Sequence, residues 1–184
     1  MNIEQAQQET RSIYLNGYPG AIVSGLLWIG SASIGTWSSP KTAMWFLVLG
    51  GMFIFPCTQL ALRLSGRPAS LSEANPLRYL AMQIAFTIPL TMPLAGVAAL
   101  YHASWFYPAM LLIVGAHYLP FVFLYGMRAY AALCGVMVAA GLAIALYVPH
   151  AFSLGGWAGG AIEIAFGTVG LALSAVRRPS PSPA

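Results

Sequence analysis

Apolar residues along this chain gather in long runs, and polar residues fill the short stretches between them. Six runs come close to the ~20 residues that a helix needs to cross a hydrocarbon core ~30 Å thick. They cover residues 20–38, 42–64, 79–101, 105–126, 129–149 and 155–176. Backbone groups in lipid must be satisfied within their own segment, and these continuous runs lack the ten-residue alternating strands of a β-barrel. The pattern therefore predicts an all-α, polytopic membrane protein built as a six-transmembrane-helix bundle.

The two ends of the chain differ from this transmembrane domain, which is expected over residues 20–176. Residues 1–19 are polar, and Ile3, Ala6, Thr10, Ile13 and Tyr14 recur there at helical spacing. The spacing predicts a cytoplasmic N-terminal segment with a short amphipathic helix over residues 3–15 that lies along the membrane surface. The last segment, RRPSPSPA at residues 177–184, is rich in Pro and Ser, and a disordered cytoplasmic tail is expected there.

Charged residues are scarce and unevenly placed. Only 7% of the residues are charged and 59% are hydrophobic, whereas about 25% are charged in soluble domains. With six spans, Lys41 falls on one side of the membrane and the other basic residues fall on the side that holds both termini. These are Arg11, Arg63, Arg67, Arg78, Arg128, Arg177 and Arg178. Because Lys and Arg concentrate in cytoplasmic loops, we expect a bacterial inner (plasma) membrane protein with both termini in the cytoplasm.

The same composition bears on partners. The basic residues form no contiguous stripe with interleaved aromatics, so no nucleic-acid partner is expected. Cys57 and Cys134 have no CxxC companion, and His102 and His150 near two helix ends have no acidic or thiol neighbour in the sequence. No cofactor and no metal is therefore expected. Membrane lipids are the expected partners, and a small-molecule or ion ligand and a homo-oligomer stay open.

Glu163 is the one carboxylate inside the apolar runs. It belongs to a stripe of small residues at alternating steps of four and three, namely Gly156, Gly160, Gly167, Gly170 and Ser174. Small residues at this spacing allow a neighbouring helix to approach closely. Glu163 is therefore expected to face protein, either another helix of the chain or a subunit interface.

A charged side chain at mid-bilayer costs ~2.5–3.5 kcal/mol on insertion scales, so the Glu163 carboxyl should be neutral, paired or hydrated. His117 is its candidate partner. Counted from the outer helix ends at ~1.5 Å per residue, His117 lies ~18 Å deep and Glu163 ~12 Å deep. If their helices are neighbours, the two side chains can exchange protons or orient a polar ligand, with Tyr118 lining the same cavity. Alternatively, each bonds a nearby hydroxyl or carbonyl group and locks the bundle.

A second polar group lies toward the cytoplasmic side. Gln59 and Arg63 are one turn apart on one run, and Arg78 and Gln83 begin the next. These side chains suit an anionic headgroup or substrate. A belt of arginines that reach the interface, together with amide bonds between helices, explains them as well.

Prolines interrupt several of the apolar runs, at Pro56, Pro89, Pro93 and Pro120. Each proline removes one backbone hydrogen bond and frees a carbonyl one turn earlier. The run TIPLTMP, residues 87–93, has two prolines four apart, with two threonines able to satisfy the freed carbonyls. It predicts a bent or locally opened third helix. Such breaks mark binding sites in many transporters, but they can equally serve the shape of a bundle.

Three longer motifs resemble those of a known family. They are PGAIVSGLLW (19–28), NPLRYL (75–80) and WFYPAMLLIVGAHYLPFVFLYGMR (105–128). They resemble an uncharacterised bacterial inner-membrane family, a domain of unknown function, over about residues 14–130. The resemblance implies no activity, cofactor or catalytic residue. It implies that the family's identity is concentrated in the third motif, with His117, Tyr118, Pro120, Tyr125 and Arg128, and it leaves Glu163 outside.

Three functions remain open at this point. The first is a protein that binds or translocates a small molecule or ion through a cavity within the bundle; if transport is proton-linked, Glu163→Gln should abolish a pH-dependent flux. The second is a membrane-embedded enzyme acting on a lipid or isoprenoid, with Glu163 and His117 as acid and base and a pocket open sideways to lipid. The third is a structural or accessory subunit without its own activity.

Overall fold

The computed structural model of the protein describes residues 1–66 and 70–176. The predictions for Arg67 and for the tail at residues 177–184, with Arg177 and Arg178, lie outside these residues. Within the described ranges every regular element is a helix. In chain order the elements are α1 (Ile3–Tyr14), η1 (Leu15–Gly17), α2 (Tyr18–Trp37), α3 (Pro40–Gly51), α4 (Ile54–Leu64), α5 (Leu77–Tyr101), η2 (Ala103–Trp105), α6 (Phe106–Tyr118), α7 (Phe121–Tyr125), α8 (Ala129–Tyr147) and α9 (Leu154–Val176).

The prediction of an all-α protein with several spans is confirmed. Among the described residues, five helices are long and apolar enough to cross a membrane, or six if the bent pair α3 and α4 counts as one span. The sequence predicts one continuous helix over residues 42–64, but α3 and α4 meet there at 53°. The reason is local, because Pro56 lacks the N–H that would bond the Met52 carbonyl, and Gly50 and Gly51 are poor helix formers.

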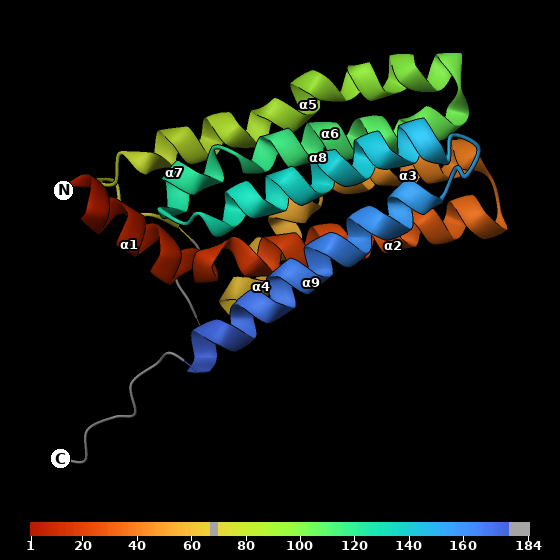
Figure 1. Cartoon of the computed structure of the whole chain (residues 1–184). Coiled ribbons are helices and arrows are strands. Elements are labelled where there is room, and N and C mark those ends of the chain that lie inside the picture. Colours follow the sequence, from red (N-terminus) through yellow and green to blue (C-terminus); the bar gives the residue numbers. More distant parts are fainter. Residues whose placement is uncertain (67–69, 177–184) are drawn as a thin grey trace.

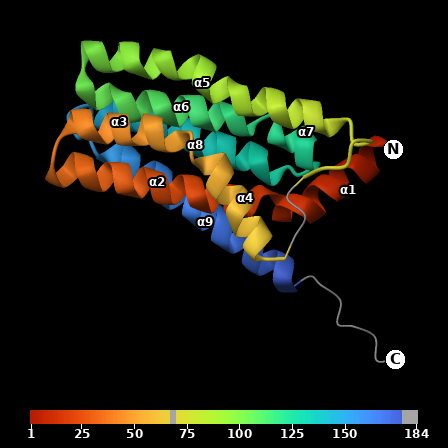
Figure 2. The same ribbon diagram turned by 180° about the vertical axis from the view of Figure 1, so that it is seen from behind.

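The long helices lie side by side, with their ends grouped at the two ends of the bundle (Figure 1, Figure 2). α2 packs against α9 and α3, and α6 packs against α8 and α5. Trp28, Tyr107, Leu111 and Met137 are fully buried between these helices. Large apolar side chains such as Leu90, which is 77% exposed, cover the outer faces. This distribution suits a bundle whose outer surface meets lipid.

Helix α1 lies across the end of the bundle that carries the N-terminus (Figure 1). Asn2 caps it by accepting a hydrogen bond from the Gln5 backbone N–H, and the Gln5 side-chain oxygen accepts one from the Asn2 backbone N–H. Ala6, Thr10 and Ile13, which the spacing places on one face, are buried. The face that we expected to lie along the membrane surface therefore packs against protein, because the end of the bundle offers it an apolar surface.

Side chains of α1 also hold the C-terminal end of α7. The Gln7 amide donates to the Phe123 carbonyl at 2.6 Å, and the Arg11 guanidinium donates to the Tyr125 carbonyl at 2.5 Å. The last carbonyls of a helix have no partner within that helix. The contact from Arg11 satisfies the Tyr125 carbonyl, and the contact from Gln7 adds to the 3.3 Å bond that the Phe123 carbonyl accepts from the Gly126 N–H. α1 is in this way tied to the third sequence motif.

Glu9 ties α1 to the segment that precedes α5. Its carboxylate accepts hydrogen bonds from the Ser72 backbone N–H at 2.8 Å, from the Ser72 hydroxyl at 3.1 Å and from the Asn75 amide at 3.0 Å. The bond from the Ser72 N–H favours the charged form and is the main reason that the pKa of Glu9 lies below its ordinary value, while partial burial opposes it.

We expect acid to loosen α1. A carboxyl group whose pKa is lowered in the folded state contributes stability above its unfolded pKa, and this contribution is lost as the pH falls through the folded pKa. Glu9→Gln should remove most of this pH dependence. It should also raise amide hydrogen exchange of residues 3–14 at pH 7 about two- to fivefold, which corresponds to ~0.5–1 kcal/mol for charged hydrogen bonds near solvent. Glu4→Gln, at an exposed position of the same helix, is the control, and equal exchange in the two variants would contradict this role.

The four prolines predicted to interrupt helices fall into two groups, those at helix breaks and those inside a continuous helix. Pro56 lies in the first turn of α4 and Pro120 immediately precedes α7, so both accompany breaks. Pro89 and Pro93 lie inside α5, which continues through them. Of the two predicted alternatives, a local opening is absent, because each proline removes only one of the many hydrogen bonds that hold a 25-residue helix. The other alternative is a bend, and Figure 1 shows one near the middle of α5.

The threonines of TIPLTMP also act differently from the prediction. The Thr87 hydroxyl donates to the Ile84 carbonyl at 2.7 Å and the Thr91 hydroxyl donates to the Thr87 carbonyl at 2.7 Å. The carbonyls freed by Pro89 and Pro93 are those of residues 85 and 89, four positions earlier. The two hydroxyls therefore bond carbonyls other than the freed ones.

Candidate functional site

The small-residue stripe of α9 packs against α2 of the same chain. A Cβ at Gly160 would lie 2.8 Å from the Gly25 carbonyl oxygen, and a Cβ at Gly25 would lie 2.9 Å from the Gly160 oxygen. A Cβ at Gly167 would lie 2.9 Å from the Tyr18 oxygen. Gly156, Gly160, Gly167 and Gly170 are buried, and Ser174 accepts a hydrogen bond from Asn16 at 3.2 Å. The stripe is thus occupied within the chain and is not available as a subunit interface.

Glu163 lies fully buried within this stripe. Tyr118 of α6 donates a hydrogen bond from its hydroxyl to Glu163 Oε1 at 2.5 Å. The side chain of Ser24, on α2, lies close to both groups. Three helices, α2, α6 and α9, therefore meet at this carboxyl group.

The second oxygen of the carboxyl group is in a different situation. Glu163 Oε2 has no hydrogen-bond partner in the part of the chain that the structure describes. No ion pair with a cation compensates the carboxyl group within the same residues. A buried carboxylate with a single donor would be costly. We therefore expect the protonated form, in which the Tyr118–Glu163 pair carries no net charge.

A stack of tyrosines extends from this pair toward α1. The ring of Tyr130 lies between those of Tyr118 and Tyr125, at 6.0 Å and 5.4 Å between ring centroids and with interplanar angles of 24° and 19°. The Tyr130 hydroxyl donates to the Asn16 carbonyl at 2.5 Å. Tyr125 thus lies in a buried stack. Tyr130 is not among the residues predicted from sequence, because a tyrosine near a helix end also suits an interfacial anchor.

His117 projects from a different side of α6 and faces α5. Its Nδ1 lies 2.8 Å from the Thr87 hydroxyl oxygen. Consecutive helical residues point roughly 100° apart, so Tyr118 reaches Glu163 and His117 does not bond it. The predicted His117–Glu163 pair is therefore replaced by two separate pairs, and the geometry gives no support for shared acid–base chemistry between these residues.

The hydrogen bonds of Thr87 favour one assignment of the proton on His117. The Thr87 hydroxyl uses its only hydrogen in the bond to the Ile84 carbonyl, so it accepts a hydrogen from Nδ1 of His117. In the neutral imidazole the lone pair then lies on Nε2. The imidazole also interacts with the Ile84 backbone carbonyl, which requires a ring N–H. None of the described residues forms a hydrogen bond with Nε2, so we assign this nitrogen as the free acceptor of the ring.

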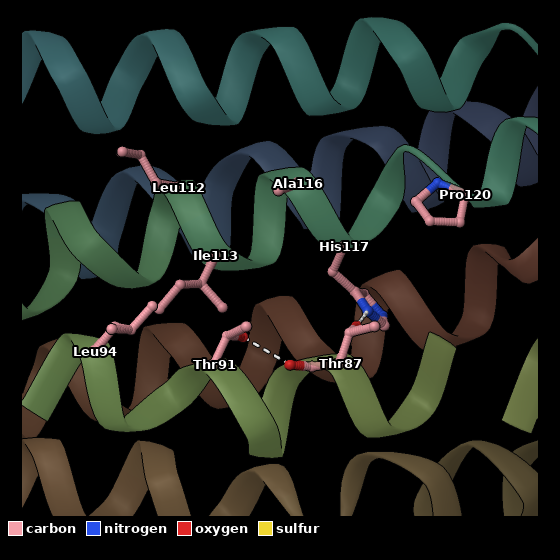
Figure 3. A pocket seen from close by; sticks show the side chains of 8 residues that line it. All are labelled: Thr87, Thr91, Leu94, Leu112, Ile113, Ala116, His117 and Pro120. Atoms are coloured by element: carbon pink, nitrogen blue, oxygen red, sulfur yellow. Dashed lines mark hydrogen bonds between the residues drawn. The ribbon is translucent and has the colours of Figure 1, made fainter. Parts of the chain in front are cut away.

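This histidine lines a cavity of about 380 Å³ between α5 and α6 (Figure 3). Its polar lining consists of Thr87, Thr91 and His117, and its other lining residues are Leu94, Leu112, Ile113, Ala116 and Pro120. Leu94 and Ala116 are exposed on the outer surface of the bundle. The cavity therefore opens sideways, toward the lipid side of the bundle.

The second polar group predicted from sequence is not assembled. Gln59 is half-buried beside Tyr14 of α1. Gln83, on α5, and Arg128, immediately before α8, are exposed. Arg78 lies over the Tyr79 ring, 5.3 Å from its centroid. This arrangement agrees with the alternative of separate side chains at one end of the bundle.

The two histidines at the other end are neighbours. The rings of His102 and His150 lie 6.2 Å apart between centroids, and His102 Nδ1 lies 2.8 Å from the Ser104 hydroxyl, which also bonds the Pro149 carbonyl. These bonds connect the α5–α6 turn to the α8–α9 turn. His102 therefore has the Ser104 hydroxyl as a hydrogen-bond partner within the turn between α5 and α6.

The features described above define a class of protein. The chain is an all-helical protein with several helices able to cross a membrane, a buried phenol–carboxyl pair and a cavity that opens sideways. It belongs to a family of unknown function, DUF7010, whose model matches residues 3–172. The match confirms the resemblance and extends it to include Glu163. No curated protein and no solved structure matches the chain.

Proposed function

We propose that the protein is a multi-pass protein of the bacterial inner membrane with both termini in the cytoplasm. The distribution of basic residues supports this orientation. Among the described residues, Arg11, Arg63, Arg78 and Arg128 belong to the helix ends grouped around the N-terminus, and Lys41 belongs to the opposite end (Figure 1). Positive residues concentrate on the cytoplasmic side of membrane proteins.

We further propose that the protein binds a small apolar molecule that enters from the lipid phase and carries a hydrogen-bond donor. The proposal rests on the hydrogen-bond assignment given above, in which the polar groups of the α5–α6 cavity offer acceptors. The hydroxyl hydrogens of Thr87 and Thr91 are used in bonds to backbone carbonyls, and His117 presents the lone pair of Nε2. A hydroxyl or amine group on the ligand completes this set, whereas a carbonyl group does not.

The position of the cavity favours uptake from lipid over a path for ions. Its lining is apolar apart from three side chains, and its volume lies in the range of small-molecule sites. Glu163 does not line this cavity. Proton-linked translocation through Glu163 therefore has less support than binding beside His117.

The test compares two ligands that differ in one hydrogen-bond donor, 1-decanol and decyl methyl ether. We expect 1-decanol to bind the purified protein about two- to tenfold more tightly than the ether, the range expected for one net hydrogen bond. Binding is measured by the shift in thermal unfolding that tryptophan fluorescence reports. His117→Phe, which keeps a ring but removes Nε2, should abolish the difference.

A matched control separates this effect from a general change in the protein. His102→Phe alters a histidine at the other end of the bundle, outside the cavity, and should retain the preference for the alcohol. Equal affinities of the two ligands for the unaltered protein would overturn the proposal, and so would a preference that survives in His117→Phe.

A further inference from the structure

A second cavity lies on the other flank of α5, between α5 and α3. Its volume is about 430 Å³, and it lies against Phe106 of α6. Figure 2 shows α3 and α5 on the same face of the bundle with α6 between them. α3 packs on α2, and α5 packs on α6. The two helices thus stand apart and leave a groove.

The groove has the length of one membrane leaflet. Along α5 its lining extends from Pro89 to Leu100, about 11 residues or ~16 Å at ~1.5 Å per residue. Half of a ~30 Å hydrocarbon core is ~15 Å. Leu100 is near the end of α5, so the groove begins at the end of the bundle opposite the N-terminus and reaches about the middle of the core.

The middle of the groove contains free space at a glycine. Gly96 is exposed, and a Cβ placed on it would meet no atom within 4 Å outside the neighbouring backbone of its own helix. Pro93 and Trp45 lie along the same lining, and Trp45 is 56% exposed. An extended hydrocarbon chain is the kind of group that such a long, apolar and laterally open groove accommodates.

The mouth of the groove carries a single positive charge. Lys41, the only lysine of the chain, lines the cavity at the beginning of α3 and is exposed. None of the described carboxyl groups forms an ion pair with it. Glu4, Glu9 and Glu73 belong to the other end of the bundle, and Glu163 is buried between α2, α6 and α9. The charge of Lys41 is therefore available for an external anion.

We propose that this groove is a binding site for an anionic phospholipid of the leaflet opposite the termini, with one acyl chain between α3 and α5 and the phosphate group at Lys41. Charge complementarity and the one-leaflet length select this occupant. The proposal does not depend on the His117 cavity, which lies on the other side of α5 and is uncharged.

The test measures lipid binding to the detergent-solubilised protein by native mass spectrometry. The probes are phosphatidylglycerol and phosphatidylcholine with identical acyl chains. We expect the unaltered protein to prefer phosphatidylglycerol about fivefold, as expected for one lysine near an anionic lipid surface. Lys41→Gln should bind the two lipids about equally, and Lys41→Arg should retain the preference for phosphatidylglycerol. Equal binding of both lipids to the unaltered protein would overturn the assignment.

A second pair of variants tests the groove separately from the charge. Gly96→Leu fills the free space and should lower the binding of both lipids several-fold. Gly135→Leu makes the same change at an exposed position of α8, where a Cβ also meets no atom within 4 Å, and should bind both lipids as the unaltered protein does. If Gly96→Leu and Gly135→Leu lower lipid binding equally, the groove is excluded as the site. Loss of a dimer in Gly96→Leu, seen as a halved mass in light scattering, would assign the groove to a second copy of the chain and overturn the lipid proposal.

Discussion

Gly160→Ala is expected to destabilise the protein by about 1–3 kcal/mol, the usual cost of adding a methyl group to a packed interior. The new Cβ would lie 2.8 Å from the Gly25 carbonyl oxygen and 2.6 Å from the Ile29 side chain. Ile29 can adjust its rotamer, but the carbonyl oxygen belongs to the backbone of α2. The two helices therefore have to separate along their contact, and other contacts of the interface weaken with them.

The measurement is unfolding in mixed micelles of dodecyl maltoside and SDS. Gly135→Ala on α8 is the control, because the same methyl group meets no atom within 4 Å there. Alanine is a better helix former than glycine by roughly 0.5–1 kcal/mol, so the control should be as stable as the unaltered protein or more stable. If Gly160→Ala resembles this control, the close α2–α9 contact is not formed in the membrane protein.

Tyr118→Phe is expected to cost about 1–3 kcal/mol, because it leaves both oxygens of the buried Glu163 carboxyl group without a donor. Glu163→Gln should cost about 1 kcal/mol or less, since an amide oxygen still accepts the bond from the Tyr118 hydroxyl. Glu163→Lys should cost most, because it introduces a cation with no carboxylate partner near mid-bilayer, at ~2.5–3.5 kcal/mol or more.

A double variant distinguishes a paired interaction from simple crowding. When both partners of a buried hydrogen bond are replaced by apolar groups, the cost is much smaller than when one partner remains. Tyr118→Phe combined with Glu163→Leu should therefore be at least as stable as Tyr118→Phe alone. Tyr125→Phe removes a hydroxyl for which the described residues provide no hydrogen bond, and it should change stability by less than about 0.5 kcal/mol. Additive effects of the two changes at Tyr118 and Glu163 would show that the pair is not coupled.

Several features of the fold are readable from local patterns. The apolar runs predict the α2, α5, α6, α8 and α9 spans, because lipid requires long helices and their length is set by the thickness of the bilayer. The spacing of Gly156, Gly160, Gly167 and Gly170 correctly indicates the packed side of α9, since four and three residues make one face of a helix. The break between α3 and α4 is predicted only in part. Pro56 marks it in the sequence, but a single missing N–H group does not show whether the helix will bend there.

The candidate site is less predictable, because it depends on how helices are rotated and ordered around one another. Depth along the membrane normal brings His117 and Glu163 to similar levels, but it does not define the rotation of α6. Neighbouring residues of a helix point roughly 100° apart. A rotation of α6 about its own axis by this angle therefore decides whether His117 or Tyr118 faces Glu163. The face of α1 is a similar case, because Ala6 and Ile13 can cover either a membrane surface or the end of a bundle.

The periodicity of small and apolar residues therefore predicts the spanning helices and the buried side of α9. It also shows that the Glu163 carboxyl group lies where a charge would be costly. Those properties follow from chain-local geometry and from the chemistry of lipid. The pairing of Glu163 with Tyr118, the acceptor-only cavity beside His117 and the groove at Lys41 arise between helices distant in sequence. Their positions depend on which helices are neighbours, and helix packing within a membrane is governed by close contacts that the pattern along one helix does not contain.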